Sequence, residues 1–388
     1  MIYKRDLLDK ILPLIDVAQA IVVTGMRRCG KTFLMQDIYN RIESTNKLFL
    51  DLENPLYQHF FEEENYEAVK ANLASQGLDF SQKTWVFLDE IQWVENLPSV
   101  VKYLSDHYRV KFFLTGSASF YLKNLFSESL SGRKYIFELF PLSFSEFLRF
   151  KNLSLVLPKT QLVSPAVWRS LQPFWQEYLE FGAFPAVVLA KNRGQKKLEL
   201  NEIFTAYFQK EVKQLADFRK TNLIRDLIIL LAENAGNLIN VERLASELKV
   251  SRLTIEEWLA FLEGTYMIAL VEPHSRHSRV AIRKAKKVYL IDWGLAGLLG
   301  NVSSGQRLEN CVFHLLRLRG KVNYFRKKSG AEIDFILDKK TAVEVKRTGV
   351  TSDLNRLRVL AKTLGLKTAV VATEKPTEGK GFCPGFSL

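Results

Sequence analysis

The segment IVVTGMRRCGKTFLM, residues 21–35, constrains the fold of this chain more than any other stretch. Four apolar or β-branched residues lead into Gly25, and the residues after the following loop place Leu34, Ile38 and Ile42 on one face of a helix. This pattern predicts a buried strand, a loop bounded by glycines and a helix. A strand of this kind belongs in a parallel sheet, so we expect an α/β fold in the amino-terminal part of the chain.

The loop between that strand and helix has the spacing of a phosphate-binding loop, or P-loop. Its glycines let backbone N–H groups surround phosphate oxygens, and the helix N-terminus adds the positive end of its dipole. Lys31 is placed to reach the β- and γ-phosphates, and the Thr32 hydroxyl to hold Mg²⁺. The sequence predicts an ATP site whose nucleotide-binding residues are Gly25, Met26, Arg27, Arg28, Cys29, Gly30, Lys31 and Thr32.

An acidic pair follows a second buried strand. In TWVFLDEIQWV, residues 84–94, three apolar residues lead into Asp89 and Glu90. Asp89 is placed to bind Mg²⁺, directly or through water. Glu90 is placed to take a proton from the water that attacks the phosphate. With Lys31, these carboxylates are the candidate catalytic residues of an ATPase.

Two further segments supply candidates with open alternatives. The strand predicted in KFFLTGSAS, residues 111–119, ends near Thr115 and Ser117, either of which could orient water or contact the γ-phosphate. A plain transition from strand to turn explains these residues equally well. Arg133 follows Gly132 on an expected turn and could act as an arginine finger, in cis or from a neighbouring subunit. An ordinary surface arginine is the alternative.

Taken together, TGMRRCGKT, FLDEIQ, LTGSAS, LSGR and FPLSFSEF resemble a prokaryotic AAA-type ATPase family. Members of that family follow the ATPase with a domain of unknown function that holds a winged helix and a nuclease-like end. The order of the motifs matches over nearly the whole chain. The resemblance implies ATP hydrolysis and a role related to DNA.

A helix-turn-helix is predicted after residue 232. Asn240 and Ser251 are placed to cap its two helices, the second of which spans residues 252–263. That second helix turns Ile255, Trp258 and Leu259 inward. Two strands, TYMIALVEP and KKVYLI, follow and flank a basic loop, which indicates a winged helix.

The predicted wing carries basic residues without one acid between Pro273 and Lys287. They are Arg276, Arg279, Arg283, Lys284, Lys286 and Lys287. Contact with a DNA backbone is one interpretation. A solvated basic loop, or a helix-turn-helix that docks a protein, is the other. Glu256 and Glu257 on the second helix would repel phosphates.

The carboxy-terminal part predicts the order α-β-β-β-α-β, as in restriction-endonuclease-like folds. Glu344 and Lys346 lie two apart on one strand and so share a face, and Asp334 lies on the preceding strand. Two carboxylates can hold Mg²⁺ and a neighbouring lysine can activate water for attack on a phosphodiester. Glu309 is a further candidate ligand.

This second set resembles the PD-(D/E)xK nucleases, with Ile333 where proline is usual. Surface charge on a sheet edge is one alternative, and a fold that binds DNA without cutting it is another. A second cluster of basic residues lies nearby and suits contact with nucleic acid under either reading. It comprises Arg317, Arg319, Lys321, Arg326, Lys327 and Lys328.

Composition narrows the compartment and the partners. The net charge of +13 and the pI of about 9.4 favour polyanionic partners, DNA first. The three cysteines form no Cys-x-x-Cys pair, so we expect neither a disulfide framework nor a zinc site, and a cytoplasmic protein. The chain shows no secretory signal and no apolar run of the ~20 residues that a membrane helix needs.

We therefore expect a P-loop AAA-type ATPase domain over residues 1–150 and a helical connector over 151–231, beginning with a linker up to residue 175. A winged helix over 232–300 and a PD-(D/E)xK nuclease-like α/β domain over 301–388 complete the chain. The function expected is ATP-driven control of DNA binding and of a metal-dependent nuclease-like centre. The alternative is a nucleotide-gated switch that docks DNA or protein and cuts nothing. A homo-oligomer and a protein partner both remain open.

Overall fold

The computed structural model describes residues 3–117, 132–153, 157, 163–215, 221–275, 285–327, 329–377 and 379–388. The chain divides into two compact units. The first unit comprises Met1–Phe140 and the short segment Gly264–Tyr266, and the second comprises Pro141–Glu263 and Met267–Leu388. Helix α7 (Phe144–Phe150), which the expected bounds place in the first domain, packs against helices α8 (Pro165–Phe181) and α9 (Pro185–Leu189) of the second unit.

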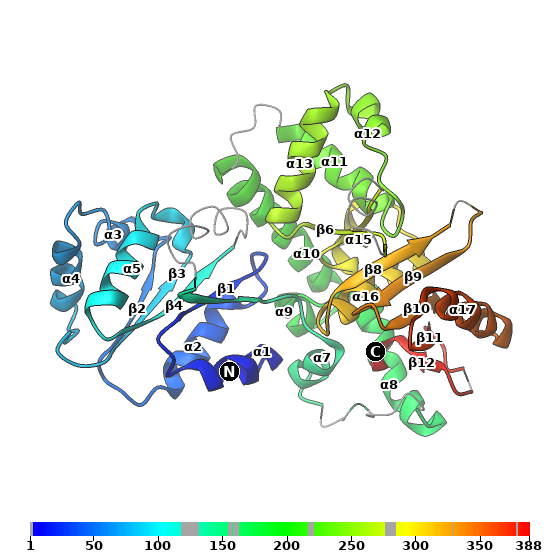
Figure 1. The fold of residues 1–388 in the computed structure, drawn as a ribbon, viewed down its shortest axis with the longest axis horizontal. Helices are drawn as coiled ribbons and strands as arrows, with labels where there is room; N and C mark the ends of the chain where they lie inside the picture. The colour runs from blue at the N-terminus through cyan, green and yellow to red at the C-terminus, as the bar shows by residue number, and fades with distance from the viewer. Residues whose placement is uncertain are drawn as a thin grey trace. The chain divides into compact units, whose positions relative to one another are not determined.

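The first unit is a parallel α/β sheet (Figure 1). Its strands run in the order β2-β3-β4-β1-β5 and every neighbouring pair is parallel. The strands are β1 (Ala20–Thr24), β2 (Lys47–Asp51), β3 (Thr84–Asp89), β4 (Val110–Gly116) and β5 (Lys134–Glu138). The described helices are α1 (Asp6–Ile11), η1 (Leu12–Leu14), α2 (Lys31–Arg41), α3 (Pro55–Gln58), α4 (Tyr66–Ser75), η2 (Ile91–Trp93) and α5 (Leu97–His107).

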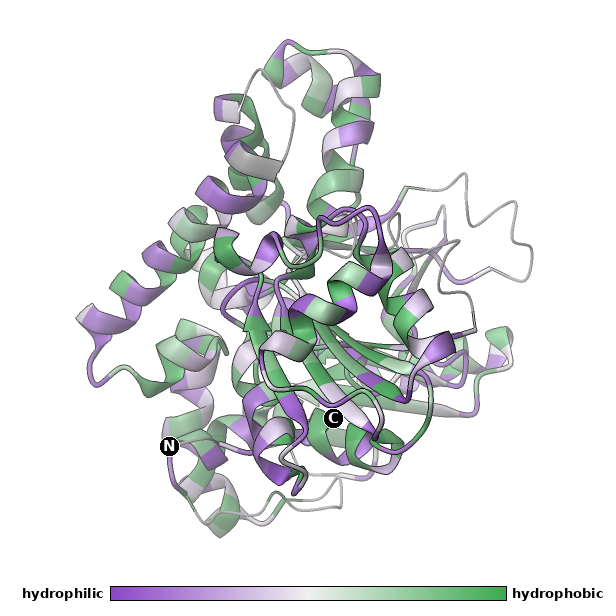
Figure 2. Cartoon of the chain, turned by 90° about the vertical axis from the view of Figure 1, so that its left-hand side faces the viewer, coloured by the Kyte–Doolittle hydropathy of each residue, from purple (hydrophilic) through white to green (hydrophobic). Residues whose placement is uncertain are grey.

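Both faces of the three central strands are covered, so β1, β3 and β4 are buried along their whole length, whereas the edge strands β2 and β5 are partly exposed. Val22, Val86 and Leu114 pack with residues of α4 and α5 on one face. On the other face Phe87 and Phe113 stack with ring centroids 4.4 Å apart, and α2 lies over β3 and β4. Figure 2 shows the strands as largely hydrophobic and the helices as divided between hydrophobic and hydrophilic residues. The predicted buried strands are therefore confirmed, and the P-loop follows the carboxyl end of β1.

The second unit begins with a series of helices, which are followed by a small antiparallel strand pair. Its first helices are α7, α8 (Pro165–Phe181), α9 (Pro185–Leu189), α10 (Arg193–Tyr207), the π-helix η3 (Phe208–Leu215) and α11 (Thr221–Glu233). The expected linker up to residue 175 is wrong in its second half, because Ser164 caps α8 and the helix runs on through Pro173. Apolar residues of that segment, such as Trp168 and Trp175, are buried, which stabilises the helix.

Two helices, α12 (Val241–Leu248) and α13 (Arg252–Gly264), precede the antiparallel pair β6 (Ile268–Val271) and β7 (Lys287–Leu290). The predicted caps are confirmed, since Asn240 accepts a hydrogen bond from the Arg243 N–H at 2.9 Å and Ser251 from the Thr254 N–H at 3.0 Å. The inward residues Ile255, Trp258 and Leu259 are buried as expected. Leu238 adds an isolated bridge to Lys287 on β7.

The chain then continues through α15 (Trp293–Leu299) and α16 (Ser304–Arg317) into a second sheet. Its strands are β8 (Val322–Arg326), β9 (Glu332–Leu337), β10 (Thr341–Lys346), β11 (Thr368–Thr373) and β12 (Phe382–Pro384), in the order β12-β11-β10-β9-β8. The helix α17 (Thr351–Leu364) joins β10 to the parallel strand β11, and η4 (Gly385–Ser387) ends the chain. The predicted order of elements from α16 to β11 is confirmed.

A buried aspartate ties the helices of the second unit together. Asp292 caps α15 by accepting from the Leu295 N–H at 3.0 Å, and it also accepts from the Ala183 N–H at 2.7 Å. A side chain at Gly182 would collide with the Asp292 carboxylate, and one at Gly294 with the Phe181 carbonyl oxygen. The segment FGAF, residues 181–184, is thus where helices α8 and α15 come into close contact.

No helix within the described ranges combines the length and the hydrophobicity needed to cross a membrane.

Candidate nucleotide site and a second polar centre

The P-loop holds its lysine in a buried position at the carboxyl end of β1. Lys31 is 4% exposed, and its Nζ donates to the carbonyl oxygens of Gly25 at 2.9 Å and Met26 at 3.3 Å. It also donates to Ser117 Oγ at 3.3 Å. Gly25 has φ +150°, and a side chain there would collide with the Leu139 carbonyl oxygen, so only glycine fits.

The hydroxyl and carboxylate predicted to hold Mg²⁺ are in direct contact. Thr32 Oγ1 donates to Asp89 Oδ2 at 2.6 Å, and the Thr115 hydroxyl donates to Asp89 Oδ1. Burial raises the pKa of Asp89, while the hydrogen bonds from Thr115 and Thr32 act in the opposite direction. A hydroxyl and a carboxylate are oxygen ligands that suit Mg²⁺, so these residues fit the ion.

Glu90 lies in a left-handed backbone conformation, with φ 53°, directly after β3. Ser117 Oγ donates to both of its carboxylate oxygens, at 3.0 and 2.7 Å, and Gln92 Nε2 donates at 2.6 Å. Burial by itself raises the pKa of Glu90, but the charges of Lys31 and Arg27 and these hydrogen bonds outweigh it, so the pKa is lowered. Glu90 is therefore an ionised, oriented carboxylate beside the P-loop.

Thr115 and Ser117, at the end of β4, belong to this network. Thr115 contacts Asp89 and Ser117 contacts both Glu90 and Lys31, so neither residue is a plain strand end. Gln92 was not predicted, although it belongs to the same segment as the acidic pair.

The other predicted nucleotide-binding residues complete the loop. Arg28 has φ 65° and Gly30 has φ +95° at the start of α2. Met26 and Cys29 are buried, and Arg27 lies 3.8 Å from Glu90 Oε1.

A tyrosine far along the chain also belongs to this region. The Tyr266 hydroxyl lies 2.5 Å from Thr24 Oγ1, in the residue before the P-loop, and donates to Glu138 Oε1 at 3.0 Å. Tyr266 has φ 63° and is part of the first unit. No local sequence signal connects it to the P-loop, because 242 residues separate Tyr266 from Thr24.

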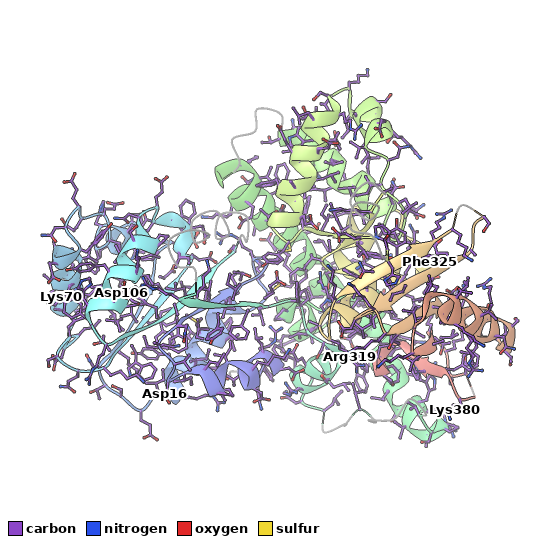
Figure 3. The ribbon with its side chains drawn as sticks, viewed as in Figure 1. Asp16, Lys70, Asp106, Arg319, Phe325 and Lys380 are labelled. Atoms are coloured by element: carbon purple, nitrogen blue, oxygen red, sulfur yellow. The ribbon has the colours of Figure 1, made fainter. Side chains whose placement is uncertain are left out.

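Arg133 lies away from this network within its own chain. Its carbonyl accepts from the Ala20 N–H, at the opposite end of β1 from the P-loop. Its guanidinium pairs with Asp106 Oδ2 at 2.8 Å; Asp106, in α5, is labelled in Figure 3. The parallel register between β1 and β5 therefore excludes a cis arginine finger in this structure.

Asp334, Glu344 and Lys346, the residues predicted for a site in the carboxy-terminal part, lie on the paired strands β9 and β10 and form a second polar centre. Asp334 on β9 accepts from the Val345 N–H of β10 at 2.8 Å. On β10, Lys346 Nζ lies 2.9 Å from Glu344 Oε1, and Arg356 of α17 donates to the same oxygen at 3.1 Å. Burial raises the pKa of Asp334 to about 7, and the nearby Glu309 and Glu344 add to the rise.

Glu309 reaches this centre from α16 but is held by other partners. Its Oε1 accepts from Lys287 Nζ at 3.2 Å and from the Tyr289 hydroxyl at 2.7 Å. Lys287 also pairs with Glu332 Oε1 at 2.6 Å. Lys287 is 3% exposed, so its expected contact with DNA is wrong. Among the described residues, no three acidic, histidine or cysteine side chains converge as ligands for one metal ion.

Only some of the other basic residues predicted to contact nucleic acid belong to the described part of the chain. Arg276, Arg279, Arg283, Lys284 and Lys328 lie outside the described residues. Lys286 lies 3.9 Å from Glu272, and Arg317 donates to the Ile291 carbonyl oxygen. Lys321, Arg326 and Lys327 are exposed around β8, where Figure 3 labels Phe325 and Arg319.

The chain is similar to uncharacterized proteins over most of its length. An uncharacterized protein of Haemophilus influenzae is 28% identical over 354 residues, which cover 87% of this chain and 84% of that protein. An uncharacterized protein of Methanocaldococcus jannaschii is 29% identical over 347 residues, covering 87% of this chain and 75% of that protein.

A solved structure of the Thermotoga maritima RuvB Holliday junction branch migration motor shows 17% identity and a TM-score of 0.33. The match covers 69% of this chain and 89% of that one.

Two family models match separate parts of the sequence. One, described as an AAA domain, matches residues 17–148, where the P-loop, Asp89 and Glu90 lie. The other is a domain of unknown function, DUF8612, and matches residues 172–306. The chain therefore carries an AAA domain over residues 17–148, followed by a DUF8612 domain over residues 172–306.

Proposed function

We propose that this protein binds and hydrolyses ATP with Mg²⁺ in its first unit and uses that cycle to control contacts of its second unit with DNA. One observation carries the first part. Lys31, Thr32, Asp89, Glu90 and Ser117 form a single hydrogen-bonded network at the carboxyl ends of three neighbouring parallel strands. In open α/β sheets this edge is where ligands bind.

Each residue of the network has a chemical role in this proposal. Lys31 exchanges its carbonyl partners in the loop for phosphate oxygens. Thr32 and Asp89 hold Mg²⁺, which neutralises phosphate charge when it is bound. Glu90 orients the attacking water and accepts its proton, and Ser117 fixes the direction of that carboxylate.

The DNA part of the proposal rests on the second unit. The order α11, α12, α13, β6 and β7, with Leu238 bridging to β7, supports our proposal of a winged helix. The net charge of +13 and the exposed Lys321, Arg326 and Lys327 favour a polyanion. We infer that the elements from α16 to β11 form a nuclease-like fold that contributes to this surface.

A specific observation favours the second candidate, a nucleotide-gated switch that binds DNA or protein without cutting it. Glu344 is already paired with Lys346 and Arg356, and Glu309 with Lys287. The residues of this centre therefore do not fit a metal ion as they stand, and we derive no cleavage step from them.

The experiment compares ATP binding and turnover in wild type, Lys31→Ala and Glu90→Gln, with and without double-stranded DNA. We expect Lys31→Ala to lose nucleotide binding, and Glu90→Gln to bind ATP while hydrolysing it about 10²- to 10⁴-fold more slowly. Lys102→Ala, at an exposed lysine of α5, is the matched control and should behave as wild type.

Hydrolysis by Glu90→Gln at the wild-type rate would show that the role assigned to Glu90 is wrong. DNA that neither binds nor changes ATP turnover, at any salt concentration, would remove the DNA part of the proposal.

A further inference from the structure

Lys287 places a buried ammonium group inside the carboxylate cluster of the second polar centre. Its Nζ lies 2.6 Å from Glu332 Oε1 of β9 and 3.2 Å from Glu309 Oε1 of α16. The side chain is 4% exposed, whereas Glu309 and Glu332 are 21% and 26% exposed. The ammonium is thus the most deeply buried charge of this ion-pair group.

The backbone and the neighbours fix Lys287 in this position. It begins β7, where it pairs with Val271 of β6, and it also bridges to Leu238. Two positions further along β7, the Tyr289 hydroxyl donates to the same Glu309 oxygen at 2.7 Å. The Tyr324 ring lies 5.8 Å from the Lys287 Nζ.

Lys287 forms ion pairs with carboxylates from two different elements, Glu332 of β9 and Glu309 of α16. The carboxylates of the cluster are therefore neutralised by the protein itself. Glu344, at the other side of the centre, is neutralised in the same way by Lys346 and Arg356.

A divalent ion would have to compete with this internal cation. Glu309 and Glu332 each direct a carboxylate oxygen at the Lys287 ammonium. A divalent ion bound between Glu309 and Asp334 would therefore lie close to a full positive charge that repels it. We propose that Lys287 takes the place of a metal ion in this centre and keeps it metal-free. The proposal rests on our inference that the elements from α16 to β11 form a nuclease-like fold.

The test measures binding of Mn²⁺ to the full-length protein without nucleotide, by electron paramagnetic resonance of the free ion. Wild type is compared with Lys287→Met and with Lys286→Met, the adjacent lysine with a side chain 35% exposed. We expect Lys287→Met to bind one additional Mn²⁺ at least about 100-fold more tightly than wild type. Lys286→Met should match wild type.

A further Asp334→Asn change locates the ion, since it should abolish the binding gained by Lys287→Met. If Lys287→Met folds only when Mn²⁺ is present, this rescue also shows that the variant has gained a Mn²⁺ site, because a ligand that binds the folded state stabilises it. The proposal is overturned if wild-type protein binds Mn²⁺ and the Asp334→Asn change in wild type abolishes that binding. It is also overturned by a folded Lys287→Met protein with no added binding. Neither outcome depends on ATP turnover, so a failure here leaves the ATPase proposal standing.

Discussion

Replacing Asp292 by asparagine should change stability in a manner that depends on pH. Asp292 is fully buried, and burial raises its pKa from 3.8 to about 6, although the N–H groups of Ala183, Leu295 and Gly294 act against the rise. A tenfold change in proton affinity corresponds to about 1.4 kcal/mol, so ionisation of Asp292 costs the folded state about 3 kcal/mol relative to the unfolded chain.

The direction follows from where the proton binds more tightly. Between about pH 4 and pH 6 the folded protein binds more protons at Asp292 than the unfolded chain, so the free energy of unfolding falls as pH rises. That contribution is fully present below the unfolded pKa of 3.8 and is lost as pH rises through about 6. Asparagine cannot ionise and lacks this dependence.

Asparagine also loses one of the two acceptor oxygens that Ala183 and Leu295 use. That loss costs about 1–3 kcal/mol at every pH. Below pH 3.8 we therefore expect wild type to be the more stable protein by that amount, and at pH 4.5 by about 1 kcal/mol less, because the unfolded chain has already begun to ionise. Between pH 4.5 and pH 8 its stability relative to asparagine should fall by about 2 kcal/mol more, so that asparagine is as stable as wild type or more stable.

Urea unfolding at pH 4.5 and pH 8, followed by tryptophan fluorescence, measures this difference. Four of the six tryptophans belong to the second unit, so the signal reports mainly the unit that contains Asp292. Other titrating groups cancel between the two proteins. Asp226→Asn, at an exposed position of α11, is the control and should show no such dependence. A stability difference that is equal at both pH values would refute the reasoning.

Two further predictions concern the first unit. Gly25→Ala should abolish ATP binding and lower the melting temperature, because the new methyl group would collide with the Leu139 carbonyl oxygen and because φ is positive at this position. The control Gly305→Ala, in α16, should have neither effect. Arg133→Ala should leave ATP binding unchanged, since the side chain pairs with Asp106 at the opposite end of β1. If a neighbouring chain supplies Arg133, hydrolysis should fall in Arg133→Ala and return on mixing with Glu90→Gln; no return on mixing counts against the trans role.

Local patterns were enough to predict most elements. Strand β1 and helix α2 follow from one apolar run and one helical spacing, and the caps at Asn240 and Ser251 follow from residue type. The contact between Thr32 and Asp89 could be expected from the sequence, because both residues are predicted ligands of the same Mg²⁺ ion.

Contacts between distant segments were not predictable in this way. Lys287 looked like part of a basic loop because the sequence neighbours of a lysine do not show which strand buries it. Tyr266 and Arg356 carry no motif, and only the packed fold places them beside Thr24 and Glu344. Residues 165–175 were predicted to be part of a linker but form helix α8. Contacts with distant segments again decide this, because they bury Trp168 and Trp175 and stabilise the helix.

The three residues Gly264–Tyr266 have a consequence for how this protein can be divided or recombined. They belong to the first unit, although the chain on both sides of them belongs to the second. A gene fragment that ends near residue 140 encodes the whole parallel sheet but leaves Thr24 and Glu138 without the Tyr266 hydroxyl. The first unit is therefore complete only in a chain that extends at least to Tyr266, so a fragment that stops near residue 140 lacks one of its buried polar partners.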